Sequence, residues 1–240
     1  MTSDSQVADT LPVVKGDRAL AFRGLVDVVL KPATFFEELR AQPKVLVPLL
    51  AVICLAVLFF IFTKDIIYTM QMNSPEGQKQ MQNLTMTPQM EKVIKYQIVI
   101  FGSITLSLVV LIAAALAYFW GNFVFAGKAA FKQLFSVALY GEWIIALGMI
   151  VGLPIIIAKD TLIAPFSLGV LAAGQGLDSF AYTALSKIDL FGIWEIIVIG
   201  IGLSAVYGVP RKKGYLLSLL SIGMLSVLHV LFSGIWKLMS

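Results

Sequence analysis

The sequence predicts an all-α, polytopic membrane protein with five transmembrane helices and an N-terminal amphipathic helix at the membrane interface. Two observations support this prediction. Five apolar stretches are each long enough to cross the roughly 30 Å hydrocarbon core of a bilayer, which needs about 20 helical residues. Hydrophobic residues make up 59% of the 240-residue chain and charged residues only 13%, against about 25% in an average soluble domain. So few charges suit a lipid-facing surface rather than a solvated one.

The N-terminal residues differ from the rest of the chain. Residues 1–19 are polar, mixed in charge and without hydrophobic periodicity, so we expect a disordered cytoplasmic tail. Residues 20–240 are then expected to form one membrane domain. We expect no cleavable secretory signal, because the first long apolar stretch begins only near Val45.

Residues 20–40 have the spacing of an amphipathic helix that is interrupted in the middle. Apolar residues recur at i, i+3, i+4 and i+7 from Phe22, and Pro32 interrupts the pattern before a second short turn. We expect a broken helix that lies on the membrane face. The expected membrane-surface contacts of this segment are Arg23, Lys31, Phe35 and Phe36. An ordinary helix packed beneath the bundle explains the pattern equally well.

The five predicted spans follow in order. They cover residues 45–62, 98–125, 134–158, 188–209 and 215–236. The first long connection, 63–97, contains Thr87-Pro88, a helix cap followed by a first-turn proline, so span two is expected to begin outside the membrane. The second, 159–187, contains a twelve-residue apolar run that is too short to span. We expect that run to be re-entrant or to lie on the surface.

Lys and Arg are distributed unevenly between the two sides. With the N-terminus inside, the inner segments hold eleven of them and the outer segments seven, and the inner loops are much shorter. The positive-inside rule therefore predicts a cytoplasmic N-terminus and an external C-terminus. The turn Arg211, Lys212 and Lys213 is expected to determine topology and to contact anionic lipid at the membrane surface.

Three ionisable residues lie within the predicted spans, where a charge costs from about 2.5 to more than 10 kcal/mol. They are Glu142, Glu195 and His229. At a rise of about 1.5 Å per residue, Glu195 and His229 each lie about 12 Å in from the outer flank of their span, and Glu142 about 15 Å from the inner flank of its own. We expect these side chains to meet as a buried polar cluster that carries protons or binds an ion or substrate. The alternatives are a hydrogen bond that locks the helices, through protonated carboxyls or Trp and Tyr donors, and a water-filled vestibule without a role.

Five of the nine methionines fall in the first long connection, and thioethers suit Cu(I). They are Met70, Met72, Met81, Met86 and Met90. No His or Cys accompanies them, so a flexible amphipathic loop is the preferred interpretation and a metal site the lesser one.

Other chemistry has little support in the sequence. The single cysteine, Cys54, rules out a disulfide framework or a cysteine metal site. No phosphate loop, dinucleotide fingerprint or nucleophile–base arrangement occurs, so we expect a non-enzymatic protein without a cofactor. The net charge of +4 comes mostly from residues that flank the spans and indicates orientation, not nucleic-acid binding.

Two stretches resemble the bacterial branch of the Yip1-domain family. The first is Lys31-Pro32-Ala33-Thr34-Phe35-Phe36-Glu37-Glu38-Leu39, followed by Pro43 and the first span. The second is a Gly–x–x–x–Phe–x–x–x–Phe run from Gly127 that leads into Ala138 and Tyr140. The five-span order and the long first outer connection are similar too, so the resemblance covers roughly residues 31–235.

The resemblance implies five transmembrane helices and a cytoplasmic N-terminus. Eukaryotic members bind lipid-modified small GTPases, but their acidic extension and their Asp–Leu–Tyr–Gly–Pro element before the first span are missing here. GTPase binding is therefore not implied. For bacterial members the family offers a fold and no established chemistry.

Together these patterns predict an integral protein of the bacterial inner membrane that accommodates or transports a small solute, ion or lipid through its helix bundle. The alternative is a scaffold that organises the membrane or recruits a partner, either a second copy or another membrane protein. A transporter needs a hydrated path to the buried carboxyls, whereas a scaffold needs an exposed docking face.

Overall fold

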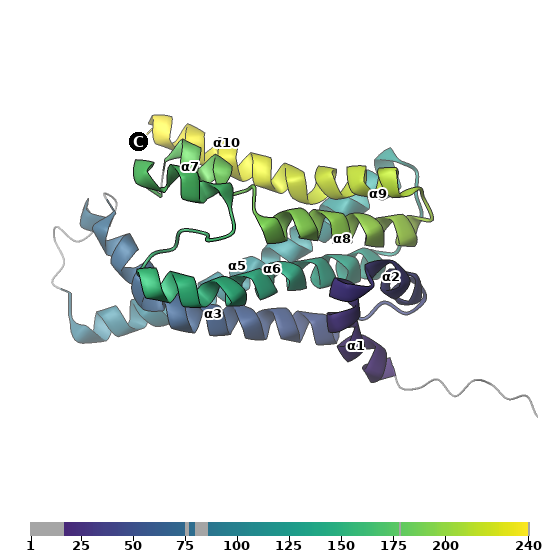
Figure 1. Cartoon of the computed structure of the whole chain (residues 1–240), viewed down its shortest axis with the longest axis horizontal. Coiled ribbons are helices and arrows are strands. Elements are labelled where there is room, and N and C mark those ends of the chain that lie inside the picture. The colour runs from purple at the N-terminus through teal and green to yellow at the C-terminus, as the bar shows by residue number, and fades with distance from the viewer. Residues whose placement is uncertain (1–16, 75–76, 80–85, 178, 240) are drawn as a thin grey trace, which may run out of the picture.

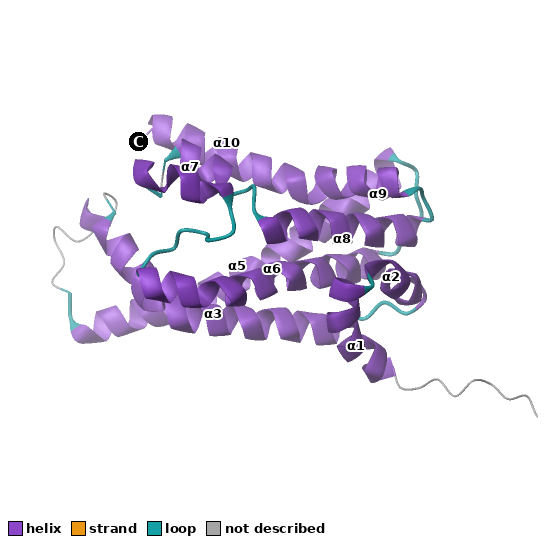
Figure 2. Cartoon of the chain, viewed as in Figure 1, coloured by secondary structure: helices purple, strands orange, loops and turns teal. Residues whose placement is uncertain are grey.

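The computed structural model describes residues 17–74, 77–79, 86–177 and 179–239. Within these residues the chain is helical and has no strand, only an isolated bridge between Ser167 and Asp189 (Figure 2). Residues 1–16 lie outside the described ranges, so the disordered tail stays a prediction. The first helix, α1 (Asp17–Leu30), begins at Asp17.

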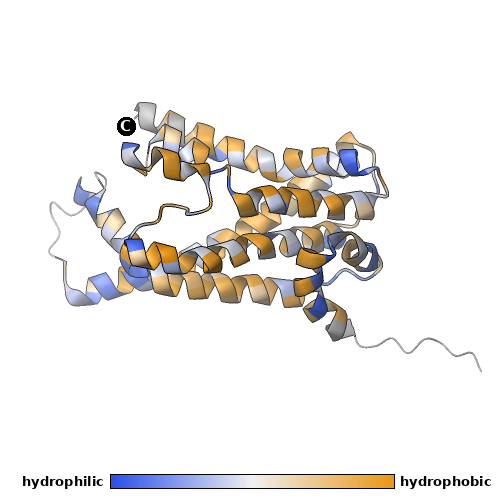
Figure 3. Ribbon diagram, in the orientation of Figure 1, coloured by the Kyte–Doolittle hydropathy of each residue, from blue (hydrophilic) through white to orange (hydrophobic). Residues whose placement is uncertain are grey.

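Among the described residues, five helical segments are long and apolar enough to cross a membrane, which confirms the predicted fold class. They are α3 (Leu46–Asn73); α5 (Pro88–Tyr118) with η1 (Phe119–Val124); α6 (Phe131–Lys159); α8 (Leu190–Tyr207); and α9 (Arg211–Ser218), η3 (Leu219–Gly223) and α10 (Met224–Met239) in series. They run along the long axis of the molecule (Figure 1), and apolar residues cover most of their length (Figure 3). The middle of the bundle therefore fits a bilayer.

The two ends of the bundle carry different elements. α1, α2 (Pro32–Ala41) and the short connections before α6 and α9 lie at one end (Figure 1). The start of α5, the connection between α6 and α8 and the end of α10 lie at the other. Arg211, Lys212 and Lys213 are exposed at the α1 end. Which end faces the cytoplasm, and whether these three cations contact lipid, stay predictions.

α3 and α5 are longer than the spans predicted for them. They have 28 and 31 residues, about 42 and 46 Å at 1.5 Å per residue, against a hydrocarbon core of about 30 Å. The Thr87 side chain accepts a hydrogen bond from the Met90 N–H and caps α5, and Pro88 occupies its first turn. The predicted helix start outside span two is therefore present.

Lys95 ties α5 to α3 in this extension. Its Nζ lies 2.8 Å from Asp65 Oδ1 and 4.9 Å from the centroid of the Tyr68 ring, and it also pairs with Glu91. We expect Lys95→Met to speed amide hydrogen exchange in the first turns of α5 about fivefold, because partly exposed ion pairs contribute at most about 1 kcal/mol. Lys92→Met on the neighbouring exposed position is the matched control and should leave exchange unchanged. Equal exchange in the two variants would contradict a role for the ion pairs.

The main core lies between α1, α2, α6 and α8. Phe35 and Phe36 of α2 are 1% and 0% exposed, and the Phe35 ring packs edge-on against Tyr140 with centroids 4.6 Å apart. Both neighbours can be buried because α2 lies between α1 on one side and α8 on the other. Gly202 of α8 leaves room for Phe36, since a Cβ there would lie 3.0 Å from the ring. This corrects the expectation that Phe35 and Phe36 contact the membrane surface, and α2 is the packed helix of the alternative.

α1 has the three faces that an interfacial helix requires. One face packs on the bundle, where Val28 is 0% exposed. The next face exposes apolar side chains four residues apart, which are Phe22, Val26 and Leu30. The third face carries Arg23. An apolar face between a protein face and a charged face suits a helix at the headgroup boundary.

The cations of this segment have different surroundings. Arg23 Nε lies 2.7 Å from Asp27, and Arg23 also pairs with Glu38 of α2. It therefore bridges the two N-terminal helices. Lys31 is exposed at the break between them. The membrane-surface contact of both cations stays a prediction.

Candidate functional site: an acidic pair beside an apolar cavity

Glu142 of α6 and Glu195 of α8 are buried next to each other. They are 6% and 7% exposed, and the charge of the Glu142 carboxyl acts on that of Glu195. α6 and α8 approach closely because Gly141 has no side chain. A Cβ at that position would lie 2.3 Å from Ile199 Cδ1 and 3.6 Å from Glu195 Cγ. The structure thus brings together two of the three predicted cluster residues.

Neither carboxyl has a hydrogen-bond donor among the residues that the structure describes. Two aromatic donors that lie near Glu142 in the sequence are used elsewhere. Trp143 Nε1 donates to the Leu25 carbonyl at 2.8 Å, and the Tyr140 hydroxyl donates to the Ala21 carbonyl at 3.0 Å. These two donors hold α1 against α6, so they do not form the predicted lock with the glutamates.

His229 does not join the pair. It is exposed on α10, where the charge of Lys187 acts on its imidazole. Beyond η3, α10 packs on α7 (Phe180–Leu185) instead of continuing along α8 (Figure 1). This corrects the expectation of a three-residue cluster, because equal depth in the membrane does not place two side chains on facing surfaces.

The structure also bears on the possible metal ligands. Within the described ranges, no group of three or more His, Cys, Asp and Glu residues can hold a metal ion. Met70 packs against the apolar cluster around Phe59 and Ile66, where its side chain fills space in the core. Met72 lies in the last turn of α3, Met86 precedes α5, Met90 lies within α5, and Met81 lies outside the described residues. A Cu(I) site in this region stays a prediction.

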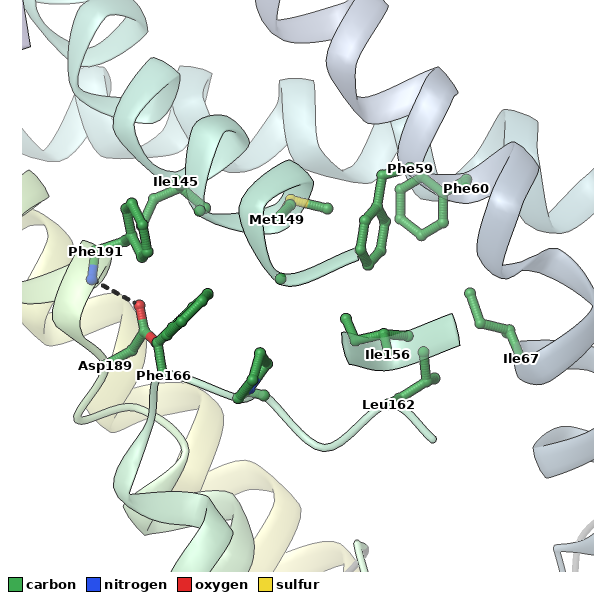
Figure 4. A pocket seen from close by; sticks show the side chains of 14 residues that line it. Phe59, Phe60, Ile67, Ile145, Met149, Ile156, Leu162, Phe166, Asp189 and Phe191 are labelled. Atoms are coloured by element: carbon green, nitrogen blue, oxygen red, sulfur yellow. Dashed lines mark hydrogen bonds between the residues drawn. The ribbon is translucent and has the colours of Figure 1, made fainter. Parts of the chain in front are cut away.

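An apolar cavity of about 340 Å³ lies along the same helix interface as the acidic pair. Figure 4 shows aromatic and aliphatic side chains from α3, α6 and α8 around it, including Phe59, Met149 and Phe191. Ile145 on its wall lies one turn beyond Glu142, and Phe191 lies one turn before Glu195. The lining includes neither carboxyl. The cavity therefore sits beside the pair without opening onto it.

Residues 162–166 cover one side of the cavity. Asp160 has a left-handed backbone conformation (φ 48°) that turns the chain back at the end of α6. Pro165 Cγ then lies 3.1 Å from the position of a Cβ on Gly152, which precedes the end of α6 by about two turns, or about 10 Å. This part of the 159–187 connection folds back along the bundle. Whether it re-enters the membrane stays a prediction.

The covering segment is hydrogen-bonded mainly to the α7–α8 side. The Tyr182 hydroxyl accepts from the Ala164 N–H at 3.2 Å and donates to the Leu162 carbonyl at 3.4 Å. The Leu190 N–H donates to the Phe166 carbonyl at 3.1 Å. Towards α3 and α6 the segment presents apolar contacts, such as Leu162 against the Phe59 cluster. The cavity wall is therefore attached to α8 and only packed against α3 and α6.

The chemistry of the cavity favours a hydrocarbon group over a hydrated ion. Among the described residues that line it, the one ionisable side chain is Asp189. Oδ1 of that residue already caps α8 by accepting from the N–H groups of Phe191 and Gly192 at 2.9 and 3.1 Å. Sequence reasoning missed this site. Phe166 and Phe191 look like ordinary core residues in an apolar run, and the one available signal was the proline-containing break within the 159–187 connection.

Comparison with known proteins agrees with the family resemblance found in the sequence. The family model described as "Yip1 domain" matches residues 26–234. The chain is 28% identical over 217 residues to "Membrane protein YknW" of Bacillus subtilis (strain 168), an alignment that covers 88% of this chain and 90% of the relative. No solved structure matches the chain.

Proposed function

This chain belongs to the Yip1 domain family, a family with bacterial membrane proteins among its members, and from that premise we propose that it accommodates the hydrocarbon chain of a lipid within its helix bundle. The observation that supports the proposal is the apolar cavity between α3, α6, α8 and residues 162–166. Its volume of about 340 Å³ falls at the lower end of the range of ligand-binding cavities, about 300–1,000 Å³. The proposed role is binding or transfer without covalent chemistry.

A lipid chain fits the lining better than the other ligands in the predicted class. An ion or polar solute needs oxygen or nitrogen ligands to replace its water, and this lining supplies one carboxylate that is already engaged as a helix cap. A hydrocarbon chain needs only apolar contacts, which contribute about 0.8 kcal/mol for each buried methylene. We also propose the bacterial inner membrane as the location, with the α1 end in the cytoplasm, from the distribution of Lys and Arg.

The test fills the cavity with a larger side chain. Ile145 lines the cavity, so we expect Ile145→Trp to lower the amount of lipid retained on the protein after detergent purification by about tenfold, because the indole displaces several methylene groups. Native mass spectrometry and lipid extraction measure the bound lipid. Ile155→Trp is the matched control, because Ile155 lies on the same helix but is 38% exposed, and it should retain lipid like the unchanged protein.

The outcomes separate the two candidate functions. Equal retention by both tryptophan variants, each with an unchanged unfolding temperature, would overturn the proposal. It would favour the alternative of a membrane-organising or partner-recruiting scaffold. That alternative draws on the exposed apolar face of α1, formed by Phe22, Val26 and Leu30.

A further inference from the structure

Residues 162–166, which cover the cavity, are held differently on their two sides. On the α7–α8 side, the Tyr182 hydroxyl bonds two of their backbone groups and the Leu190 N–H bonds a third. The Phe166 ring also packs edge-on against Phe191 of α8, with the ring centroids 5.4 Å apart (Figure 4). These contacts attach the covering segment to α7 and α8.

The side that faces α3 and α6 has apolar contacts instead. α3 and α6 lie wholly within the described residues, and no hydrogen bond joins either helix to residues 162–166. Leu162 packs against the Phe59 cluster, and Pro165 Cγ lies 3.1 Å from the position of a Cβ on Gly152. We call this contact surface the seam, with Leu162 and Pro165 on one side and Phe59 and Gly152 on the other.

The two sides differ in what their separation requires within a bilayer. When an apolar contact opens, acyl chains can fill the gap, because they are as apolar as the protein core. A backbone N–H or carbonyl that loses its partner finds no water in the hydrocarbon region. Ile155, three residues from Gly152 on α6, is 38% exposed, so the surface of α6 beside the seam is open to lipid. Opening the seam therefore requires less free energy than detaching the segment from α7 and α8.

The covering segment also has a point about which it can turn. Asp160 ends α6 in a left-handed conformation, and the Thr161 N–H donates to the Ile156 carbonyl at 3.2 Å. These features fix the chain as far as Thr161, and the residues that follow are only packed against α6. A movement of residues 162–166 away from α6 therefore turns about Thr161 and leaves the helix intact.

We propose that residues 162–166 are a gate, which parts from α3 and α6 at the seam while it stays attached to α7 and α8, and that the acyl chain of a phospholipid enters and leaves the cavity through this opening. This inference rests on the proposed lipid-chain function and adds the route and the moving part. A gate controls access and not affinity. It therefore changes the rates of loading and release by the same factor and leaves the amount bound at equilibrium unchanged.

The test closes the seam with a disulfide. Gly152→Cys/Pro165→Cys is made in a Cys54→Ala background, which removes the one native cysteine. The new sulfur at position 165 takes about the place of the Pro165 Cγ, next to the new Cβ at position 152, as disulfide geometry requires. The full chain in detergent micelles is loaded with phosphatidylglycerol that has deuterated acyl chains, and unlabelled phosphatidylglycerol then displaces it. Native mass spectrometry follows both steps.

We expect oxidation to slow loading and release about tenfold or more, and reduction of the same protein to restore both rates. The single variants Gly152→Cys and Pro165→Cys are the controls, and their rates should not respond to the oxidant. Equal rates in the oxidised and reduced double variant, with the disulfide shown to be complete by intact mass, would overturn the gate.

Leu162→Ala tests the gate without a cross-link. The shorter side chain loses packing that holds the seam closed, so loading and release should both become about fivefold faster. Faster release with unchanged loading would mean weaker binding and would contradict the gate. Leu171→Ala is the matched control, because Leu171 lies on η2 (Leu168–Gln175) of the same connection and is 79% exposed. It should keep both rates.

The gate and the cavity function fail in different ways. If Ile145→Trp retains as much lipid as Ile155→Trp, the cavity function is wrong and the gate fails with it. If Ile145→Trp loses lipid while the oxidised double cysteine variant loads and releases at unchanged rates, the cavity function stands and the gate alone is wrong.

Discussion

Replacing Gly214 with alanine is expected to destabilise the protein by about 3 kcal/mol or more, a severe loss for a single methyl group. Gly214 of α9 faces Gly200 of α8 at the closest approach of these helices. A Cβ on Gly214 would lie 2.2 Å from the Gly200 carbonyl oxygen and 2.9 Å from the Ser204 backbone nitrogen. These are backbone atoms that no rotamer change can move. The new methyl group must therefore separate the two helices or distort them.

Gly223→Ala is the control for this prediction. Its Cβ would lie 3.7 Å from Leu219 Cδ2, which is ordinary van der Waals contact. Because alanine favours a helix over glycine by about 1 kcal/mol, this variant should be neutral or slightly stabilised. Unfolding in mixed detergent micelles, followed by circular dichroism, measures both variants. Similar stability for the two would show that the α8–α9 contact is looser than the structure indicates.

The five spans were predictable because the bilayer imposes a simple requirement. A crossing helix needs about 20 apolar residues, and the sequence provides five such stretches. The ends of α3 and α5 were not predictable by the same criterion, since both helices continue outside the lipid. Their extension is polar, and the ion pair between Lys95 and Asp65 that joins the two helices depends on residues 30 positions apart.

Hydrophobicity could not separate lipid-facing side chains from buried ones. Phe22 and Phe36 both belong to the apolar pattern of the N-terminal helices, yet one is 63% exposed and the other 0%. In a membrane protein the acyl chains and the protein core are equally apolar. The composition of a helix face therefore does not show whether that face points to the lipid or to the protein core. The error on Phe36 arose from this ambiguity.

The candidate site was predictable in part, for related reasons. The depth of a residue follows from its distance along a helix, so Glu142 and Glu195 could be placed near one level. The direction of a helix after an irregular turn does not follow from distance, so the path of α10 after η3 and the position of His229 could not be placed. The cavity had no sequence signature, because a space between side chains depends on how four distant segments pack.

Replacing both buried glutamates with methionine, Glu142→Met/Glu195→Met, is expected to stabilise the protein by about 1–4 kcal/mol, as replacement of buried ionic groups by apolar ones often does. Methionine has a similar length and an unbranched, flexible chain, so it can fill the same space. The glutamates have no hydrogen-bond donor among the described residues, and two adjacent carboxyls are costly in hydrocarbon. Thermal unfolding in detergent measures the change. Glu91→Met, which removes a partly exposed carboxylate paired with Lys95, is the control and should be slightly destabilised.

The sign of this change decides why the acids are present. A gain in stability means that Glu142 and Glu195 weaken the fold, so their presence is explained by function, since proteins lose stability at sites that serve activity. Glu195→Gln keeps the size of the side chain and removes its ionisable proton. This variant should then retain less lipid after detergent purification while leaving the fold intact. A loss of more than about 1 kcal/mol in the double methionine variant would instead support the helix-locking hydrogen bond, because a satisfied polar pair contributes about that much to stability. In that case the cavity alone would have to account for lipid binding. Ile145→Trp would still lower lipid retention, whereas Glu195→Gln would leave it unchanged.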